Sequence, residues 1–377
     1  MLQLSAACKS GISRDMYKVL HIVKGLGLGG TEKVMQLMVL GLRNSPFKPA
    51  VLSLEDGERA ALLRDGGVEV TISQNLFECI VERQPDIVHV HRAGWPEPKL
   101  LRPLAAARLQ VKRQKGLPFP IVETNVFGRH DPSPEARNLA ATLFVSHFCA
   151  RRFSRQYGIS LTAPRRQVLY NPIDFTTIAE RTTPPAQRDY SRPLVGRVSR
   201  PDPGKWSELA LSWLPRVCSR IPDFRYKIIG GIAPAEQFVR EHHLEQYVEF
   251  LPPFVRDAEL ADFLNGLSVF AHANDTGESF GLVIAEAMAA GLPVVTHPAA
   301  GQRDNAQLEL VEHGKTGIVA GNTEEYAAAL LWLLQHPQEA RRMGEAGREK
   351  AGREFDQAVI ATKLSKIYEE LLAEQNQ

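Results

Sequence analysis

The chain has 377 residues, of which 44% are hydrophobic and 23% charged. This indicates an ordinary folded protein of about two domains and excludes a disordered, fibrous or disulfide-stapled chain. The net charge of +2 hides an asymmetry, because residues 1–180 carry 24 Lys and Arg against 16 Asp and Glu. Either an anionic partner approaches this basic first half, or the surface charges are distributed between the two halves of the chain by chance.

The predicted location follows from what the sequence lacks. The four cysteines form no CxxC pair, which favours a reducing compartment and argues against a cysteine zinc site. Residues 1–16 are predicted to be an N-terminal extension without the apolar core of a signal peptide, and no apolar run reaches the roughly 18 residues of a membrane span. We expect a cytoplasmic protein, in solution or at the inner face of the membrane.

Short β-branched runs alternate with amphipathic stretches, as in parallel sheets covered by helices. In the first half, strands are predicted at 17–23, 49–54, 68–72, 86–91, 119–124, 140–145 and 167–170. The proline-containing segment 171–192 is predicted to be a linker. In the second half we expect strands at 194–199, 225–230, 248–251, 269–272 and 293–296, a helix at 205–220, and helices from 323 to 374.

A glycine-rich turn follows the first predicted strand. Residues 25–30 read GLGLGG, which satisfies GxGxxG and precedes a predicted helix at 31–42. Glycines let a phosphate approach the helix N-terminus, and Glu55 and Asp56 follow the next strand where a dinucleotide fold places an acid. An NAD-dependent dehydrogenase is therefore one hypothesis, although any tight strand-to-helix turn favours glycine.

Two cations flank a turn in the second half. Gly196 and Arg197 close a predicted strand, and Lys205 opens the following predicted helix. Cations on the two sides of one turn can clamp a diphosphate and stabilise its charge as it leaves. The alternative is a pair of solvated surface cations.

The most informative segment is 278–295, with the sequence ESFGLVIAEAMAAGLPVV. Glu286 lies within an apolar helix, where a carboxylate is costly unless it is bonded, for example to the hydroxyls of a ribose. The alternative is an acid paired within the core, with a partner that the sequence does not name. Glu278 precedes the helix, where it can reach a ligand or cap the helix N-terminus.

Together, the segment 278–295, the Gly-Arg…Lys element upstream of it and the Gly-Gly-Thr-Glu turn at 29–32 resemble glycosyltransferase family 4. The resemblance implies an α/β protein of the GT-B fold, with two Rossmann-like doubly wound domains facing a central cleft. It implies an acceptor-side domain at 17–180, a nucleotide-sugar domain at 193–355, and a helix at 356–377 that packs back on the first domain.

The resemblance also implies roles for single residues. Arg197 and Lys205 would hold the donor diphosphate, Glu286 the ribose, and Glu278 the transferred sugar, with Arg197, Lys205 and Glu278 as the catalytic set. The full set implied to bind the donor is Gly29, Gly30, Gly196, Arg197, Lys205, Glu278, Ser279, Phe280, Gly281, Leu282 and Glu286.

The implied reaction moves a hexose from a UDP- or GDP-sugar to a hydroxyl of a glycan or lipid-linked acceptor, with retention of configuration, in cell-envelope polysaccharide or glycolipid synthesis. The departing diphosphate would take the acceptor proton. No Asp-x-Asp motif occurs in the chain, so we expect a metal-independent enzyme without a cofactor.

The acceptor side departs from the family pattern. Family members often place a histidine that contacts the donor sugar after the strand that ends here at Thr124. This chain has Asn125 there, so either Asn125 or His130 of the same loop would make that contact. His89 and His91 alternate along a strand, a spacing that metal sites also use, but no third ligand is evident. An acceptor-side role for His91, or packing of both, is favoured over metal binding.

Partners follow from the remaining features. The segment 99–115 combines six cations with leucines and predicts either a basic amphipathic helix on an anionic membrane or an ordinary helix covering the sheet. Nucleic acid binding is not expected, because aromatic residues make up only 7% of the chain. Besides the dehydrogenase, the alternatives are a GT-B phosphorylase or epimerase and a catalytically silent nucleotide-sugar-binding protein.

Overall fold

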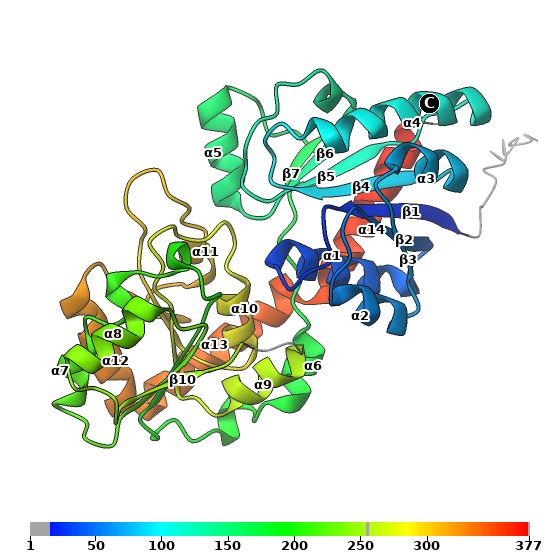
Figure 1. Cartoon of the computed structure of the whole chain (residues 1–377). Helices are drawn as coiled ribbons and strands as arrows, with labels where there is room; N and C mark the ends of the chain where they lie inside the picture. Colours follow the sequence, from blue (N-terminus) through cyan, green and yellow to red (C-terminus); the bar gives the residue numbers. More distant parts are fainter. Residues whose placement is uncertain (1–15, 254–255, 376–377) are drawn as a thin grey trace, which may run out of the picture.

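The computed structural model describes residues 16–253 and 256–375, so the predicted N-terminal extension lies outside the described residues except for Met16. The chain forms two α/β domains, drawn at the upper right and lower left of Figure 1. Each domain is built on one parallel sheet. The predicted fold class is confirmed.

The first domain has a seven-stranded sheet in the order β3-β2-β1-β4-β5-β6-β7. Strands β4 and β5 in its middle are buried on both faces, whereas the edge strands β3 and β7 are partly exposed. The strands are β1 (Tyr17–Val23), β2 (Phe47–Ser53), β3 (Glu69–Ile72), β4 (Ile87–Arg92), β5 (Ile121–Asn125), β6 (Leu139–Phe144) and β7 (Arg166–Val168).

Helices cover both faces of this sheet. They are α1 (Gly30–Gly41), α2 (Arg59–Asp65), α3 (Leu76–Arg83), α4 (Pro98–Lys115) and α5 (His147–Tyr157). Polar residues at the helix starts fix their ends: the side chain of Asn75 accepts from the backbone N–H of Glu78 before α3, and that of Ser146 from Cys149 before α5. The sheet order reverses direction between β1 and β4, which places a binding crevice at their carboxyl ends.

The second domain has a six-stranded sheet in the order β10-β9-β8-β11-β12-β13. Its strands are β8 (Leu194–Val198), β9 (Arg225–Ile229), β10 (Val248–Leu251), β11 (Val269–Ala271), β12 (Val294–Thr296) and β13 (Gly317–Val319). Its helices are α7 (Leu214–Cys218), α8 (Ala233–Glu241), α9 (Asp257–Asn265), α10 (Leu282–Ala289), α11 (Gln307–Leu310), α12 (Thr323–Gln335) and α13 (Pro337–Phe355). The order reverses between β8 and β11, so the crevices of both sheets face the gap between the domains.

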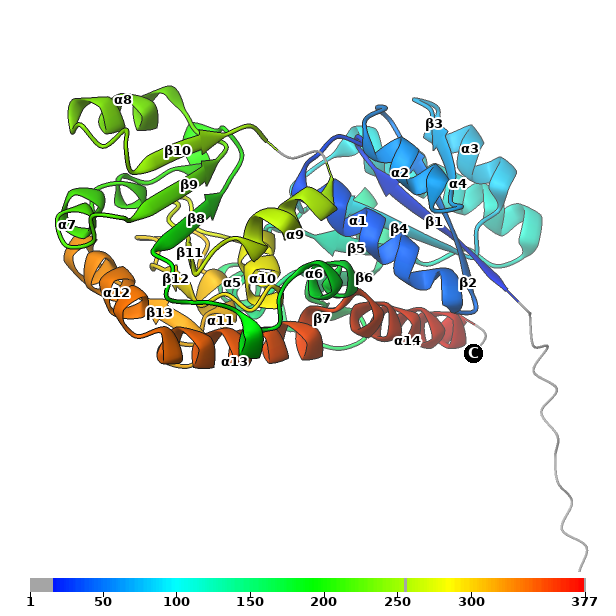
Figure 2. The ribbon, with the colours of Figure 1, turned by 90° about the horizontal axis from the view of Figure 1, so that it is seen from below.

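The chain crosses between the domains twice at one place. Ile173 on the outward crossing donates to Phe355 at 2.9 Å and accepts from Gln357 at 3.0 Å on the return. Figure 2 shows α13 lying along the second domain and α14 (Gln357–Gln375) continuing along the first. Ile360, Leu364 and Tyr368 of α14 are buried in the core of the first domain, as the resemblance predicts.

Three predicted elements are wrong or incomplete. The helix predicted at 205–220 is replaced by two 3₁₀ turns and α7, because Pro215 has no N–H and cannot lie in the interior of a longer helix. The linker predicted at 171–192 contains α6 (Phe175–Arg181), which packs on α9. Strand β13 was not predicted.

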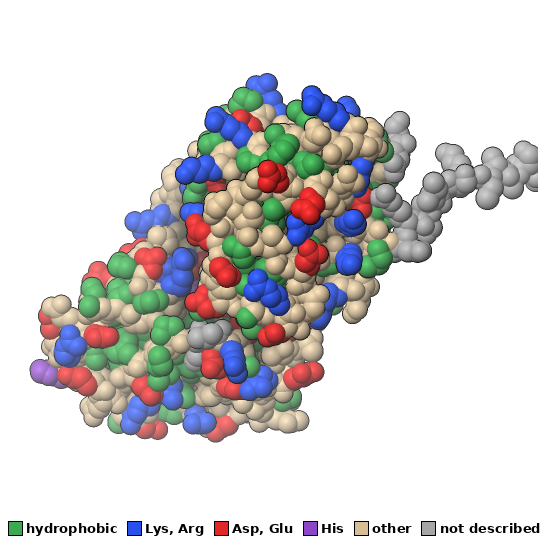
Figure 3. All heavy atoms as spheres, turned by 45° about the vertical axis from the view of Figure 1, so that its right-hand side comes forward, with side chains coloured by type: hydrophobic (Ala, Val, Ile, Leu, Met, Phe, Trp, Pro, Cys, Tyr) green, Lys and Arg blue, Asp and Glu red, His purple; other side chains and the backbone are tan. Residues whose placement is uncertain are grey.

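The α4 helix shows which alternative holds for the basic segment 99–115. Its leucines at 100, 101 and 104 are buried against the sheet, and only Leu109 is exposed, at 58%. The segment is therefore a cover helix whose outer face is basic. Figure 3 shows Lys and Arg side chains (blue) at the upper end of the molecule, where the first domain lies. Among the described residues, no helix combines the length and apolarity needed to cross a membrane.

Candidate active site

A cavity of about 760 Å³ lies between the domains, at the carboxyl ends of both sheets. The starts of two helices face each other in its wall: Gly29 and Gly30 at α1, and Gly281 and Leu282 at α10. A Cβ atom on Gly30 would lie 3.4 Å from Cδ1 of Leu282, so the two domains meet closely there. Unpaired N–H groups at both helix starts favour an anionic ligand.

Arg197, from the end of β8, supplies a buried cation to this cleft. Its side chain is 1% exposed, and its Nη2 donates to the carbonyl oxygen of Lys205 at 2.6 Å. The guanidinium carbon lies 4.7 Å from the ring centre of Trp206. Among the described residues no carboxylate pairs with Arg197, and its buried Nε has no hydrogen-bond partner. A buried cation without a counter-ion favours an anion at this place.

Lys205 and Glu278 form an ion pair in the cleft. Nζ of Lys205 lies 3.0 Å from Oε2 of Glu278. The other oxygen, Oε1, accepts from Nδ2 of Asn274 at 2.7 Å and lies 3.3 Å from Nε2 of His272. Three neighbours, Lys205, Asn274 and His272, therefore hold the Glu278 carboxylate in place.

The protonation states of this group follow from its contacts. Burial acts to raise the pKa of Glu278, but the hydrogen bond from His272 and the charge of Lys205 outweigh it and lower the pKa to about 2. Burial lowers the pKa of His272. At neutral pH, Glu278 is ionised and His272 is neutral with its proton on Nε2. Glu278 can accept hydrogen bonds from a ligand but cannot act as an acid.

Glu286, buried within α10, has a partner in the other domain. Its Oε1 lies 2.5 Å from Nζ of Lys33 on α1, and the same Nζ lies 2.7 Å from Oδ1 of Asp257 on α9. Burial acts to lower the pKa of Lys33, but the two carboxylates outweigh it and raise the pKa. All three residues line the cleft, so a charged lysine joins the domains at the position where a ribose is predicted.

We expect the change Lys33→Met to destabilise the protein by about 3 kcal/mol, because it leaves the buried carboxylate of Glu286 and the partly exposed one of Asp257 without their cation. Urea unfolding at pH 7 measures this, with the exposed Lys48→Met as the matched control. Combining Lys33→Met with Glu286→Gln should recover part of the loss. If the losses of unfolding free energy in Lys33→Met and Glu286→Gln simply added in the double variant, a direct interaction between Lys33 and Glu286 would be contradicted.

The glycine-rich turn is only partly in the cleft. Gly29 and Gly30 line the cleft. The segment that follows β2 packs over the first half of the turn, where the backbone N–H of Arg59 donates to the carbonyl oxygen of Leu26 at 2.9 Å. A Cβ on Gly57 would collide with the backbone of Leu26. Gly25 and Gly27 do not line the cleft, and a Cβ on either would meet no backbone atom within 4 Å. Only the second half of GxGxxG therefore borders the cleft, which weakens the support for the dehydrogenase hypothesis.

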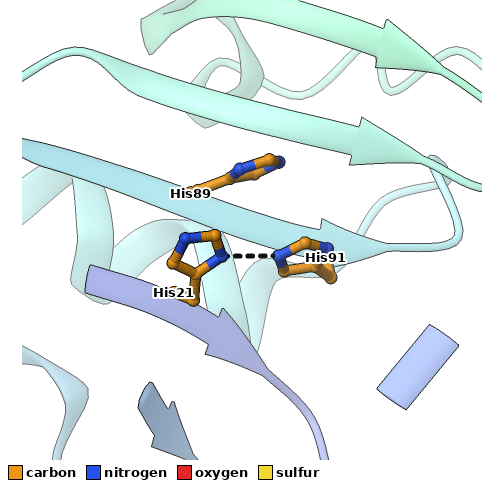
Figure 4. A group of neighbouring side chains, drawn as sticks. All are labelled: His21, His89 and His91. Carbon is orange, nitrogen blue, oxygen red and sulfur yellow. Dashed lines mark hydrogen bonds between the residues drawn. The ribbon is translucent and has the colours of Figure 1, made fainter. Parts of the chain in front are cut away.

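Three buried histidines gather on β1 and β4, as Figure 4 shows. Nδ1 of His21 and Nε2 of His91 are 3.0 Å apart, while His89 contacts the hydroxyl oxygens of Tyr368 at 2.6 Å and Thr124 at 2.8 Å. The expectation that no third histidine accompanies His89 and His91 is wrong, because His21 comes from the neighbouring strand.

This histidine cluster has the character of a packed core. The His89 and His91 rings stack at a centroid distance of 4.4 Å with 20° between their planes, and those of His21 and His91 at 5.3 Å with 17°. One ring nitrogen of each histidine lies within 4.8 Å of the others, which is also the spacing of a metal site, but both nitrogens of His89 already contact hydroxyl oxygens. Burial lowers the pKa of His21 to about 3, so the cluster is neutral.

The structure brings ten of the predicted site residues to the cleft and leaves four elsewhere. Gly29, Gly30, Arg197, Lys205, Glu278, Ser279, Phe280, Gly281, Leu282 and Glu286 line it. Gly196 lies in β8, where a Cβ would collide with Leu267, so its role is packing. His91 belongs to the histidine cluster.

Asn125 and His130 line a second cavity. Nδ2 of Asn125 donates to the carbonyl oxygen of Arg129 at 2.8 Å, and Oδ1 accepts from the backbone of Arg129 at 3.2 Å. The Asn125 side chain thus fixes the loop after β5. The expectation that Asn125 or His130 lies beside the transferred sugar does not fit these positions.

Several cleft residues were missed from the sequence. His272 and Asn274 follow β11 and hold Glu278, and Lys33 and Asp257 hold Glu286. His272 could have been found, because a polar residue at the carboxyl end of an apolar parallel strand is placed at the binding edge. Lys33 and Asp257 carry no local signal of their pairing.

The comparisons with known proteins agree with this geometry. Residues 192–336 match the model of the family "Glycosyl transferases group 1". A phosphatidyl-myo-inositol mannosyltransferase of Mycobacterium leprae is 32% identical over 178 residues, which are 47% of this chain and 45% of that protein. Spore coat protein SA of Bacillus subtilis is 24% identical, covering 90% of this chain and 95% of that protein.

Among solved structures, Anabaena Alr3699/HepE in complex with UDP and glucose has a TM-score of 0.75 at 20% identity, covering 94% of this chain and all of that one. The likeness establishes the class: this chain has the GT-B fold of two Rossmann-like domains around a cleft. With the family match to the second domain, it confirms the predicted resemblance. The second domain, over residues 192–336, is similar to the family "Glycosyl transferases group 1", and the whole chain resembles glycosyltransferase family 4 in its fold.

Proposed function

We propose that the protein is a retaining, metal-independent glycosyltransferase that moves a hexose from a UDP- or GDP-sugar to a hydroxyl of a glycan or lipid-linked acceptor. The observation that carries this is Arg197, a buried cation without a carboxylate partner, beside Lys205 at the edge of a cleft. Support comes from the family match, from relatives named as mannosyltransferases of a phosphoinositide, and from the UDP in the structurally similar protein.

In the proposed reaction, Lys205 and Arg197 neutralise the diphosphate as it departs. Arg197 acts partly through the backbone, since its bond to the carbonyl oxygen of Lys205 fixes the turn that carries the ammonium. The Phe280 ring packs on Tyr170 and Phe355 at 5.8 and 5.3 Å, which holds the backbone of residues 279–281 at the cleft. The N–H groups at the start of α10 would add to the stabilisation of the phosphates.

Glu278 would orient the sugar and Glu286 the ribose. Since Glu278 is ionised and anchored by His272 and Asn274, we assign it hydrogen bonds from sugar hydroxyls and no proton transfer. The acceptor proton would go to the departing diphosphate oxygen. Closure of the domains on the substrates would exclude water as a competing acceptor.

The place of synthesis is part of the proposal. We propose a cytoplasmic enzyme that works in cell-envelope polysaccharide or glycolipid synthesis, as the names of its relatives suggest. Contact with an anionic membrane would rest on the outward lysines and arginines of α4, because the helix uses most of its leucines for the core.

Calorimetric titration with UDP, GDP and NADH, with EDTA present, tests the donor class. We expect one nucleoside diphosphate to bind and NADH not to bind, with no change when EDTA is replaced by Mg²⁺. Binding of NADH alone would contradict the proposal and restore the dehydrogenase. Slow hydrolysis of the nucleotide sugar to the free nucleoside diphosphate is the second readout. A catalytically silent protein would bind the diphosphate but would not hydrolyse the nucleotide sugar.

A further inference from the structure

A second cavity, of about 170 Å³, lies in the first domain among β5, β6, β7 and the loop that follows β5. Its wall is rich in basic side chains contributed by four separate segments of the chain. These are Arg92, Arg129, His130, Arg137, Arg165 and Arg166.

Most of this charge is not compensated. The two acidic residues in the wall, Glu123 and Asp131, both pair with Arg92, at 2.7 and 2.9 Å. Five arginines against two carboxylates leave the wall with a net charge of +3.

The other four arginines of the wall have no protein partner. In the described part of the chain, no carboxylate lies within ion-pair distance of Arg129, Arg137, Arg165 or Arg166, and their guanidinium groups make no hydrogen bonds. Arg129 and Arg166 are half-buried, and Arg137 and Arg165 are exposed. The four unpaired positive charges are therefore within reach of an anion from solution.

The cavity is separate from the cleft where the donor is proposed to bind. Side chains alternate along β5 and its extension: Thr124 and Val126 face the cleft, whereas Glu123 and Asn125 face the cavity. The two spaces therefore lie on opposite faces of the same strand end. A ligand of the cavity cannot be the diphosphate that Arg197 and Lys205 would hold.

We propose that this arginine-lined cavity binds a phosphoryl group, as inorganic phosphate or as the phosphate ester of a larger molecule. Guanidinium groups fit tetrahedral oxyanions with paired N–H donors, and several of them on one small space favour a doubly charged anion. The site also contains part of the excess of basic residues in the first half of the chain.

The cavity and the cleft share one loop. Arg129 and His130 line the cavity, while Val126 and Phe127 at the start of the same loop line the cleft. Arg152 donates to the carbonyl oxygen of Phe127 and pairs with Asp304 of the second domain. A phosphoryl group on Arg129 would thus fix a loop that borders the cleft and contacts the other domain.

Calorimetric titration of the full chain with inorganic phosphate, at an ionic strength held constant with chloride, tests the proposal. We expect the double change Arg129→Gln and Arg166→Gln to weaken phosphate binding by more than tenfold. Arg155→Gln, an exposed arginine of α5 outside the cavity, is the matched control and should change the Kd less than twofold. If the double variant does not fold, Arg165→Gln, at an exposed position, replaces it in the test and should also weaken phosphate binding.

The change Lys205→Ala separates this site from the proposed function, since it disables the cleft but should leave phosphate binding intact. The proposal would be overturned if phosphate affinity were unchanged in the Arg129→Gln/Arg166→Gln double variant and in Arg165→Gln. It would also be overturned if only Lys205→Ala lost phosphate binding. A parallel titration with glycerol 3-phosphate distinguishes the sources: tighter binding than inorganic phosphate indicates a phosphorylated molecule, and equal binding indicates free phosphate.

Discussion

Replacing Lys205 by alanine is expected to lower turnover of the nucleotide sugar by about 10²- to 10³-fold, because the departing diphosphate loses the cation that neutralises it. The affinity for the nucleoside diphosphate should fall by at least tenfold. Both are measured on purified protein, as donor hydrolysis and as a calorimetric Kd. The fold should persist, since the side chain of Lys205 is 28% exposed and Glu278 keeps its contacts with His272 and Asn274.

The matched control is Lys227→Ala, a lysine of the same domain with 37% side-chain exposure and a pair with Glu249. It lies outside the residues that line the cleft, so its activity should stay within twofold of the parent. A Lys205→Ala protein that keeps its turnover would show that the cation next to Glu278 takes no part in the reaction.

The second large effect concerns acid stability. We expect the free energy of unfolding to fall steeply as the pH drops below about 6.5, because His21, His89 and His91 are buried neutral and their pKa values are lowered by burial. In the unfolded chain each histidine binds a proton near pH 6.5, whereas the folded chain takes up none there. Three protons bound only on unfolding correspond to a slope of about 4 kcal/mol per pH unit.

This stability is fully present above pH 6.5 and is lost progressively toward pH 5, where carboxylates begin to contribute as well. Urea unfolding at half-unit pH intervals measures the slope. The change His91→Gln should reduce it by about 1.4 kcal/mol per pH unit, and the exposed His242→Gln should not. Equal slopes for the two variants would mean that the histidine cluster takes up protons while folded.

Local sequence patterns predicted the parts of the molecule that depend on neighbours along the chain. Apolar runs bounded by glycine or proline indicated twelve of the thirteen strands, and the segment 278–295 gave two of the glutamates that line the cleft, Glu278 and Glu286. The failure at 205–220 had a local cause too, since Pro215 excludes a continuous helix.

Contacts between distant segments could not be predicted in this way. Lys33 and Glu286 are 253 residues apart and belong to different domains, and His21 and His91 are 70 residues apart on adjacent strands. Their pairing is set by the strand order and by the way the domains face each other. For the same reason, the family resemblance suggested Asn125 near the sugar, whereas the alternation along β5 turns its side chain to the other face.

The return of α14 to the first domain has a consequence for synthesis on the ribosome. Ile360, Leu364 and Tyr368 fill the core beneath β1 and β4, and the Tyr368 hydroxyl bonds to His89. The first domain to be translated therefore lacks part of its interior until residues 357–375 have emerged. The second domain, whose sheet and helices end at Phe355, has its own elements complete earlier, so the domain made last is the first that can finish folding.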